Sequence, residues 1–409
     1  MMETPINQSS PTLLYIDLDS CFATITQQSY PHLRGKPLAI VAYAQENSCI
    51  LSPSKEAKKY GIKTGMKVSD ARLLCPRLIT QTANVALIRD VHDRFIKICR
   101  QYSPHIFPYS IDEVALDMSH REDVSEQTLI LTAQSIKKDI RRDIGEWITG
   151  SVGIATNRFL AKIAASFKKP DGLYVLNSKN VKQTYAVLTL RQLPGINTAN
   201  SMRLASYNIF TPLQFLYAPY CLLRHKVFKS ITGYLWYMKL RGWEIDDTCH
   251  KRKSFSHEYT SQKPLSSYVE ISSLLIHLCE KVVRRLRKHG YATQGVSLCF
   301  FFADHTVWHT SKTFPQPFVA VKEFFAHAVE IMREKPAGKA VRKLSVGSFH
   351  LIERHSLQMG LFDEKRNKLH AVTDAVDHIN DMYGEHTVSS ALSLAAKRII
   401  TDRIAFGKC

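Results

Sequence analysis

The five residues Tyr109-Ser110-Ile111-Asp112-Glu113 place two acidic side chains next to each other in a run that is otherwise apolar. The run follows Pro108 and continues through Val114-Ala115-Leu116, a composition that predicts a β-strand. Adjacent carboxylates in a strand repel each other and lose hydration unless a cation or another partner compensates. Two solvated acids at a strand edge are the simplest interpretation, but a second acidic strand end in the chain would favour a shared cation.

A second acidic strand end lies near the N-terminus, at Leu13-Leu14-Tyr15-Ile16-Asp17-Leu18-Asp19. Its apolar part predicts a buried strand over residues 12–17. Residues two positions apart on a strand point to the same face, so we expect Asp17 and Asp19 to overhang one site. Neighbouring residues point to opposite faces, so Asp112 and Glu113 can share that site only if their strand turns or bulges.

The composition is that of a basic globular protein. The chain has 409 residues, enough for two to four domains, and 45% of them are hydrophobic. Its 55 Lys and Arg residues outnumber the 36 Asp and Glu residues, which gives a net charge of +19. That excess favours a polyanionic partner, with nucleic acid first and an anionic membrane surface second.

The cysteines and the N-terminus indicate where the protein works. The nine cysteines contain no CxxC pair, which argues against a zinc site, and their odd number argues against a disulfide framework. The N-terminus has no signal-peptide pattern, and no apolar run approaches the ~20 residues of a membrane span. We therefore expect a protein of the reducing cytoplasm.

Two segments combine lysines with the start of a helix. Residues 54–61 predict a helical turn ended by Gly61, with Lys55 and Lys58 on one face. These two lysines can clamp a phosphate or simply be solvated. Residues 150–155 predict a strand that runs into a helix carrying Lys162, and a strand followed by a helix N-terminus can form an anion site.

The second half of the chain suits contacts to nucleic acid. Residues 193–197, followed by a helix over 198–207, resemble half of a helix–hairpin–helix, in which Gly195 would offer backbone N–H groups to a phosphate. Asn197 replaces the usual second glycine and tolerates left-handed dihedrals. A basic connector at 250–253 precedes an α+β unit, with helices predicted at 267–289 and 319–333 and strands at 295–302 and 343–351. Residues 356–364 indicate a docking peptide.

Three blocks of this sequence resemble the Y-family, lesion-bypass DNA polymerases. They are Ile16 to Phe22, Tyr109 to Glu113 and Val152 to Ala164, and Lys169-Pro170-Asp171-Gly172 extends the third block. They occur in the order and spacing of the family, and the likeness covers nearly the whole chain. The tail and the region around Trp236 resemble the polymerase V branch more than the polymerase IV branch.

The resemblance implies an α+β right-hand fold. It consists of a palm with a mixed sheet and helices, small fingers, a helical thumb with a helix–hairpin–helix, and an α+β little finger. The implied boundaries are 1–24 and 81–175 for the palm, 25–80 for the fingers, 176–248 for the thumb, 249–254 for a basic linker, 255–355 for the DNA-binding little finger, and 356–409 for a clamp-binding peptide and C-terminal tail.

The resemblance also implies a template-directed DNA polymerase that adds dNTPs to a primer 3′-hydroxyl without proofreading. Asp17, Asp112 and Glu113 match the catalytic carboxylates that hold two Mg²⁺ ions, and the backbone carbonyl of Leu18 is a further ligand. Such a pair of ions acidifies the attacking hydroxyl and neutralises the leaving pyrophosphate. Mg²⁺ prefers oxygen ligands, so a few carboxylates suffice.

Other residues receive roles from the same resemblance. Phe22, a core aromatic by composition alone, matches the steric gate that excludes a ribose 2′-hydroxyl. Lys162 matches a triphosphate-binding lysine, and Lys55 and Lys58 stand where the family often has Tyr and Arg. The implied contacts to the sliding clamp are Gln358, Met359, Leu361 and Phe362, and those to the DNA backbone are Gly195, Lys253 and Ser254.

The implied partners are primer–template DNA, dNTPs and the bacterial sliding clamp (β), with recombinase or accessory subunits as further candidates and no membrane. Two other functions compete with this one. A non-catalytic scaffold that binds DNA and clamp is disfavoured because all three carboxylates are present. A palm-like nucleotidyl cyclase leaves the clamp-like peptide and the basic C-terminal domain unexplained.

Overall fold

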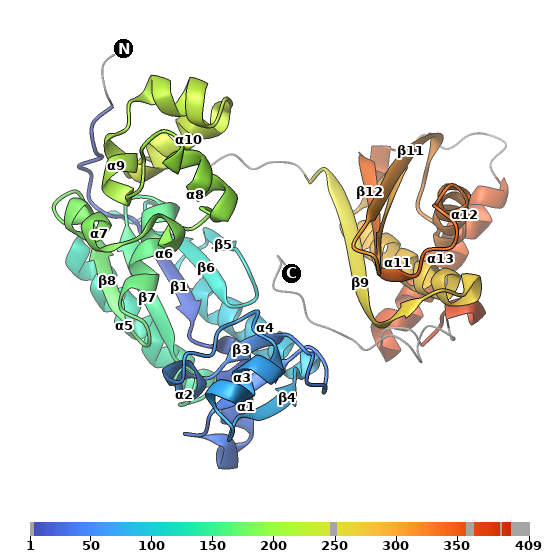
Figure 1. The fold of residues 1–409 in the computed structure, drawn as a ribbon, viewed down its shortest axis with the longest axis horizontal. Helices are drawn as coiled ribbons and strands as arrows, with labels where there is room; N and C mark the ends of the chain where they lie inside the picture. The colour runs from blue at the N-terminus through green and yellow to red at the C-terminus, as the bar shows by residue number, and fades with distance from the viewer. Residues whose placement is uncertain (1–3, 246–251, 357–363, 385–386, 394–409) are drawn as a thin grey trace. The chain divides into compact units, whose positions relative to one another are not determined.

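The computed structural model describes residues 4–245, 252–356, 364–384 and 387–393. The chain divides into two compact units, one formed mainly by residues 1–249 and the other by residues 250–402 (Figure 1). Each unit is built on its own β-sheets and hydrophobic core. Within the described ranges, no helix is both long and apolar enough to cross a membrane.

The first unit is centred on a five-stranded sheet with the order β5-β6-β1-β7-β8. The central strand β1 pairs antiparallel with β6 on one side and with β7 on the other, and β7 pairs parallel with β8. The strands are β1 Leu13–Leu18, β5 Ile106–Pro108, β6 Glu113–Asp117, β7 Gly150–Ala155 and β8 Leu173–Leu176. The predicted strand at 150–155 is confirmed, and the one at 12–17 is shifted by one residue.

The strand predicted for the run after Pro108 is confirmed from Glu113 onward, where it is β6, whereas residues 109–112 form a turn. The backbone N–H groups of Tyr109 and Ser110 donate to the carbonyl of Glu113 over 2.9 and 3.4 Å, which closes a hairpin between β5 and β6. Asp112 precedes β6, and Glu113 is its first residue. The chain thus turns where two neighbouring carboxylates must face one site.

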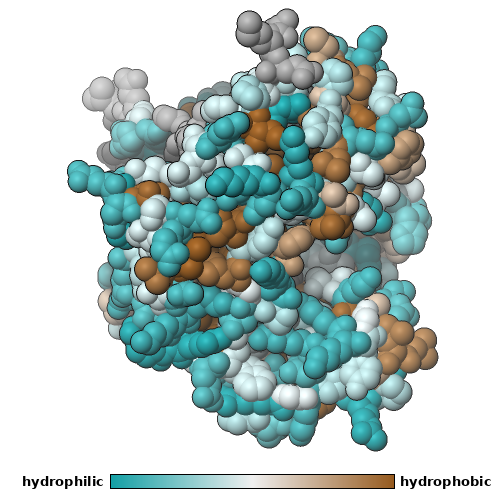
Figure 2. Space-filling view, turned by 90° about the vertical axis from the view of Figure 1, so that its left-hand side faces the viewer, coloured by the Kyte–Doolittle hydropathy of each residue, from teal (hydrophilic) through white to brown (hydrophobic). Residues whose placement is uncertain are grey.

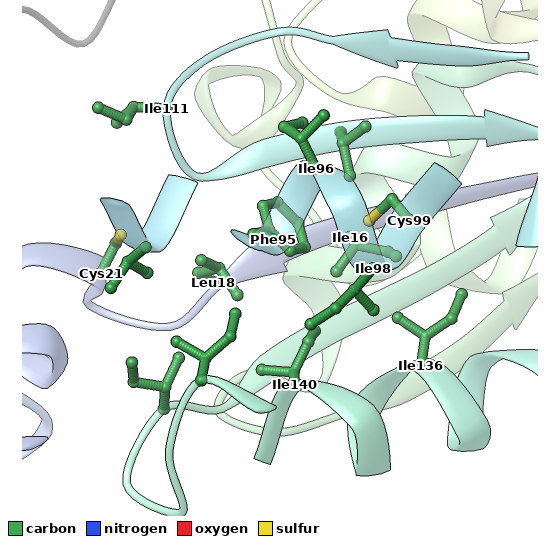
Figure 3. Close-up of a cluster of buried hydrophobic side chains, with 14 of the residues drawn as sticks. Ile16, Leu18, Cys21, Phe95, Ile96, Ile98, Cys99, Ile111, Ile136 and Ile140 are labelled. Carbon is green, nitrogen blue, oxygen red and sulfur yellow. The ribbon is translucent and has the colours of Figure 1, made fainter. Parts of the chain in front are cut away.

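Alternation along β1 separates two layers of the core. Leu14, Ile16 and Leu18 pack on one face with helices α4 (Val85–Tyr102) and α5 (Glu126–Asp143). Figure 3 shows Ile16 and Leu18 on this side, together with Phe95 and Ile98 of α4 and Ile140 of α5. Tyr15 belongs to the opposite layer, where α6 (Arg158–Phe167) packs on the sheet.

A smaller three-stranded sheet, with the order β3-β2-β4, forms around its own core. The elements of this region are α1 Cys21–Ser29, β2 Leu38–Val41, β3 Ile50–Pro53, α2 Lys55–Lys59, α3 Val68–Leu74 and β4 Ile79–Thr82. The Ser54 hydroxyl accepts from the N–H of Ala57 and caps α2, and Gly61 follows that helix with a φ of +83°. The predicted helical turn at 54–61 is confirmed.

Four short α-helices follow the main sheet. They are α7 Val181–Val187, α8 Thr198–Ala205, α9 Pro212–Tyr217 and α10 Ile231–Leu240. The predicted turn before α8 is present, with Gly195 at a φ of +91°. Asn197 does not take left-handed dihedrals: its φ is −87°, and its side chain caps α8 by accepting from the N–H of Asn200.

The second unit has a four-stranded sheet with the order β11-β10-β12-β9. Its elements are β9 Ser254–Leu265, α11 Tyr268–Lys288, β10 Tyr291–Phe302, β11 Val307–Phe318, α12 Val321–Met332, β12 Val341–Glu353 and α13 Glu364–Tyr383. The two central strands and helices α11 and α12 confirm the predictions. Strands β9 and β11 were missed because, as the largely exposed edges of the sheet, they carry mostly polar residues and prolines.

Candidate active site

Three carboxylates meet at one end of the main sheet. Asp17 and Glu113 are partners in the antiparallel register of β1 and β6, although the chain between them is long. The N–H of Leu18 donates to the carbonyl of Asp112 over 3.0 Å, which holds the acidic turn against the end of β1. The predicted trio is therefore assembled by strand pairing.

Lys162 reaches this site from α6. Its Nζ atom lies 2.8 Å from Oε2 of Glu113, and the hydroxyl of Tyr15 donates to the same oxygen over 3.0 Å. Tyr15 precedes Asp17 by two residues on β1, so both point toward the layer of α6. The role of Tyr15 could have been inferred from that spacing.

Lys169 is a site residue that the sequence analysis missed. Its Nζ atom lies 2.5 Å from Oδ2 of Asp17. The only signal was its place in the block Lys169-Pro170-Asp171-Gly172, which extends the third motif block. In the structure, this block forms the turn between α6 and β8 and places the ammonium group of Lys169 beside the carboxylate of Asp17.

Lys55 and Lys58 also lie beside this site. Lys55 donates to the hydroxyl of Thr149 over 2.7 Å, so it is not simply solvated. Desolvation of its ammonium group lowers the pKa of Lys58, and the charge of nearby Lys169 lowers it further. All three lysines assigned to a triphosphate therefore lie around the carboxylates, together with Lys169.

The carboxylates differ in how strongly they hold their protons. Burial raises the pKa of Asp17 to about 7, although Lys169 opposes this shift, and Glu113 and Asp112 add to it. Burial likewise raises the pKa of Asp112. Burial acts upward on Glu113 as well, but the hydrogen bonds from Lys162 and Tyr15 outweigh it and keep the pKa of Glu113 below its usual value. The site therefore concentrates negative charge at an energetic cost that a bound cation would relieve.

Asp19 follows the end of β1, so the strand geometry used to predict its place does not apply, although the charges of Asp19 and Asp17 both act on Lys58. Strand β1 ends at Leu18, and the backbone leaves the extended conformation at once, with Ser20 at a φ of +50°. The carboxylate of Asp19 instead accepts hydrogen bonds from the hydroxyls of Thr149 and Ser151.

Phe22 lies in the first turn of α1 and is buried in the core cluster that also contains Leu18 and Cys21. Burial, together with the charges of Asp112 and Asp17, raises the pKa of the Cys21 thiol. The start of α1, which carries Phe22, therefore lies beside the carboxylates.

The remaining predicted residues lie elsewhere in the chain. Gly195 belongs to the turn before α8, and Lys253 and Ser254 stand at the start of β9 in the second unit. The predicted clamp contacts Gln358, Met359, Leu361 and Phe362 lie outside the residues that the structure describes.

The donor atoms suit a hard divalent cation, because carboxylate and carbonyl oxygens are the ligands that Mg²⁺ prefers. Their present arrangement holds ammonium groups instead: Asp17 pairs with Lys169, and Glu113 pairs with Lys162. Among the described residues, no three His, Cys, Asp or Glu side chains are gathered closely enough to enclose a metal. A metal ion that bound the same oxygens as these ammonium groups would displace Lys169 from Asp17 and Lys162 from Glu113.

Comparisons with known proteins agree with this geometry. Residues 16–166 match the impB/mucB/samB family, and residues 252–361 match its C-terminal domain. The chain is 31% identical to a DNA polymerase IV of Pelotomaculum thermopropionicum, over 96% of this chain and 97% of that protein. It is also 31% identical to a DNA polymerase IV of Moorella thermoacetica, over 96% of this chain and 98% of that one.

Solved structures share the fold. A Y-family DNA polymerase chimera, Dbh-Dpo4(243-245)-Dbh, superposes with a TM-score of 0.72 and 23% identity, over 83% of this chain and 99% of that chain. An insertion ternary complex of Dbh DNA polymerase superposes with a TM-score of 0.60, over the same shares of both chains.

These relatives also bear on the branch within the family. Both curated relatives carry the name DNA polymerase IV, so the expected closeness to the polymerase V branch is not supported. With 31% identity over nearly the full length of both proteins and a right-hand α+β fold, the chain belongs to the Y-family of DNA polymerases and is a DNA-directed DNA polymerase.

Proposed function

We propose that this polymerase carries out translesion synthesis, with Asp17, Asp112 and Glu113 as its catalytic carboxylates. The observation that carries the proposal is the pairing of Asp17 with Glu113 across β1 and β6, with Asp112 bonded to the end of β1. Four lysines lie around this acidic centre: Lys55 and Lys58 from α2, Lys162 from α6, and Lys169 from the turn after α6. A paired set of carboxylates ringed by cations suits a reaction in which both metal ions and phosphates must be held.

The reaction is attack of a primer 3′-hydroxyl on the α-phosphate of a dNTP, with pyrophosphate as the leaving group. Asp17, Asp112, Glu113 and the carbonyl of Leu18 would hold two Mg²⁺ ions, which acidify the hydroxyl and neutralise the pyrophosphate. Lys162 and Lys169, which now pair with Glu113 and Asp17, would be released if metal ions took those oxygens. Together with Lys55 and Lys58, they can then pair with the triphosphate.

The remaining roles follow the same assignment. Phe22 is proposed as the gate that excludes the ribose 2′-hydroxyl, since the start of α1 lies beside the carboxylates. Gly195, Lys253 and Ser254 are proposed contacts to the DNA backbone, a type of contact that positions a duplex without reading its sequence. The related Dbh structure is an insertion ternary complex, which supports primer–template DNA and dNTP as ligands here. We expect synthesis without proofreading.

The direct test is primer extension by Asp112→Ala and Glu113→Ala. Loss of either carboxylate removes charge that the metal ions need, so we expect extension to fall by about a thousandfold or more. Binding of primer–template DNA should persist, because phosphate contacts dominate it.

Asp117→Asn is the matched control, because Asp117 ends the same strand β6 that Glu113 begins. It should extend primers like the unaltered protein. Undiminished extension by either of the alanine variants contradicts the assignment of the active site.

The segment from Gln358 to Phe362 is proposed to bind a sliding clamp. Its deletion should lower processivity in the presence of clamp and leave distributive synthesis unchanged. Equal losses in both assays would show damage to folding and contradict the clamp role.

A further inference from the structure

The buried carboxylate of Asp19 receives hydrogen bonds from two directions. Only 3% of this residue is exposed. Its Oδ1 accepts from the hydroxyl of Ser151 over 2.8 Å, and its Oδ2 accepts from the hydroxyl of Thr149 over 2.9 Å and from the N–H of Asp171 over 2.7 Å. Asp19 thus joins the end of β1 to β7 and to the turn before β8.

The two hydroxyls extend this network outward. Thr149 accepts from the ammonium of Lys55 over 2.7 Å, and Ser151 accepts from the N–H of Gly172 over 3.3 Å. Each hydroxyl therefore uses its lone pair toward an outer donor and its only hydrogen toward Asp19. The carboxylate of Asp19 is thus the final acceptor for Lys55 through Thr149, for Gly172 through Ser151, and for Asp171 directly.

The turn that Asp19 holds is the one that carries Lys169. Asp171 adopts a φ of +54°, an uncommon conformation for a residue with a side chain. Lys137 of α5 secures the other side of the turn by donating to the carbonyl of Asp171 over 2.5 Å. With Asp171 held from both sides, Lys169 is kept 2.5 Å from Asp17.

We propose that Asp19 is a positioning residue, which places Lys169 and Lys55 at the nucleotide end of the active site without itself binding metal. This inference rests on the proposed function for its consequence in catalysis. Its structural part rests on the hydrogen bonds alone.

The chemistry of the network explains why a carboxylate is needed. An ionised carboxylate only accepts hydrogen bonds and can serve all three donors at once. An asparagine would place its NH₂ group against at least one of them, and an unsatisfied buried donor is costly. Asp19→Asn therefore keeps nearly the same side-chain shape but disrupts the hydrogen bonds that anchor Thr149, Ser151 and Asp171 to residue 19.

Amide hydrogen exchange tests the anchor independently of polymerisation. In Asp19→Asn, the amides of Asp171 and Gly172 should exchange faster by about tenfold or more. Asp171 loses part of its own acceptor, and Gly172 donates to the Ser151 hydroxyl, which is no longer held by a carboxylate. Asp123→Asn is the control: it makes the same chemical change at an exposed carboxylate that is paired with Arg121. Unchanged exchange at Asp171 in Asp19→Asn would overturn the proposal.

Steady-state kinetics test the consequence. Asp19→Asn should raise the KM for dNTP by about tenfold and change the Kd for primer–template DNA by less than about twofold. Thr149→Val removes only the branch to Lys55, so it should raise the KM less and leave exchange at Asp171 unchanged.

Combination with Lys169→Ala separates positioning from general damage. If Asp19 acts through Lys169, then Asp19→Asn should raise the KM for dNTP only slightly when Lys169→Ala is already present. The increase should be no larger than the one that Thr149→Val causes alone. The proposal is overturned if Asp19→Asn raises the KM as much in the Lys169→Ala variant as in the unaltered protein. It is also overturned if Asp19→Asn lowers kcat, DNA affinity and thermal stability together. If the unaltered protein fails to extend primers, the proposed function fails, while amide exchange still decides the anchor.

Discussion

At Asp17, burial and two neighbouring carboxylates oppose ionisation, and Lys169 favours it. The balance leaves the pKa of Asp17 at about 7, whereas Glu113, its partner across the strands, has its pKa held low by Lys162 and Tyr15 in spite of its burial. Two carboxylates in register therefore differ in charge near neutral pH. A bound cation would remove this difference, since opposite charge favours the ionised form.

Asp17→Asn should make the metal-free protein more stable above pH 7. The unfolded value of 3.8 lies below the folded value of about 7, so the folded state binds the proton more tightly. The stabilisation from that proton is complete below the unfolded pKa and is lost as pH rises through the folded pKa. Asp17→Asn has no carboxyl proton to lose at this position. Its free energy of unfolding, relative to that of the unaltered protein, should therefore increase by roughly 1–3 kcal/mol between pH 5 and pH 8.

Urea unfolding at both pH values, without Mg²⁺, measures this difference. Asp123→Asn is the control and should show no such pH dependence, because its carboxylate is exposed. An equal difference in the free energy of unfolding at pH 5 and pH 8 would show that the Asp17 proton is not responsible.

Phe22→Leu should relax sugar selection. Leucine keeps most of the buried apolar volume, whereas Phe22→Ala in this core would cost about 3–5 kcal/mol of stability. If the ring excludes the 2′-hydroxyl, the preference for dNTP over NTP should fall by about tenfold or more in primer extension. Unchanged selection in a folded variant would remove the gate role.

At the scale of elements, the contact between α6 and β7 sets where Lys162 lies. A Cβ atom on Gly153 would lie 2.0 Å from the carbonyl oxygen of Ala161 and 2.2 Å from the backbone N of Ala165. Only glycine permits this approach, because the opposing atoms are helix backbone and not a flexible side chain. The distance between helix and sheet in turn brings Lys162 to Glu113.

Gly153→Ala should therefore destabilise the protein and weaken catalysis together. We expect a loss of about 1–3 kcal/mol or more in the free energy of unfolding, as for other overpacked cores. Gly150→Ala is the matched control on the same strand, since a Cβ there meets no atom closer than 3.6 Å. Thermal unfolding and primer extension of both variants check this, and equal stability would contradict the packing argument.

At the scale of the whole molecule, the net charge of +19 is carried on two units with separate cores. On the face drawn in Figure 2, hydrophilic side chains predominate, and hydrophobic ones gather in separate patches. Within the described part of the second unit, several arginines already pair with acids, such as Arg287 with Asp377 and Arg354 with Asp374. The count of 55 Lys and Arg residues therefore overstates the number of cations available to DNA, whereas the net charge already subtracts the acids.

Affinity for primer–template DNA should fall steeply with salt, because phosphate binding releases counterions. Lys253→Gln should weaken binding to every sequence alike and reduce the slope of log K against log salt by about 1. Fluorescence anisotropy between low and physiological salt measures both. A slope unchanged by the variant would show that Lys253 contacts no phosphate.

Local sequence patterns determined much of this protein. The strand at β7, the helices α2, α11 and α12 and the turn at Gly195 follow from periodicity and turn chemistry, which act over a few neighbouring residues. The three motif blocks also indicated the polymerase family, because their residue types and order are specific. The acidic trio was predicted for the same reason.

Tertiary structure alone decided how the site is assembled. Four features depend on partners distant in the chain: the register of Asp17 with Glu113, the turn at 109–113, the ion pair of Lys169 and the hydrogen bonds of the buried Asp19 carboxylate. A local pattern reports a backbone preference, but which carboxylate meets which cation is set by strand pairing and close packing. The two edge strands were missed for a related reason: their pairing, and not their own hydrophobicity, makes them strands.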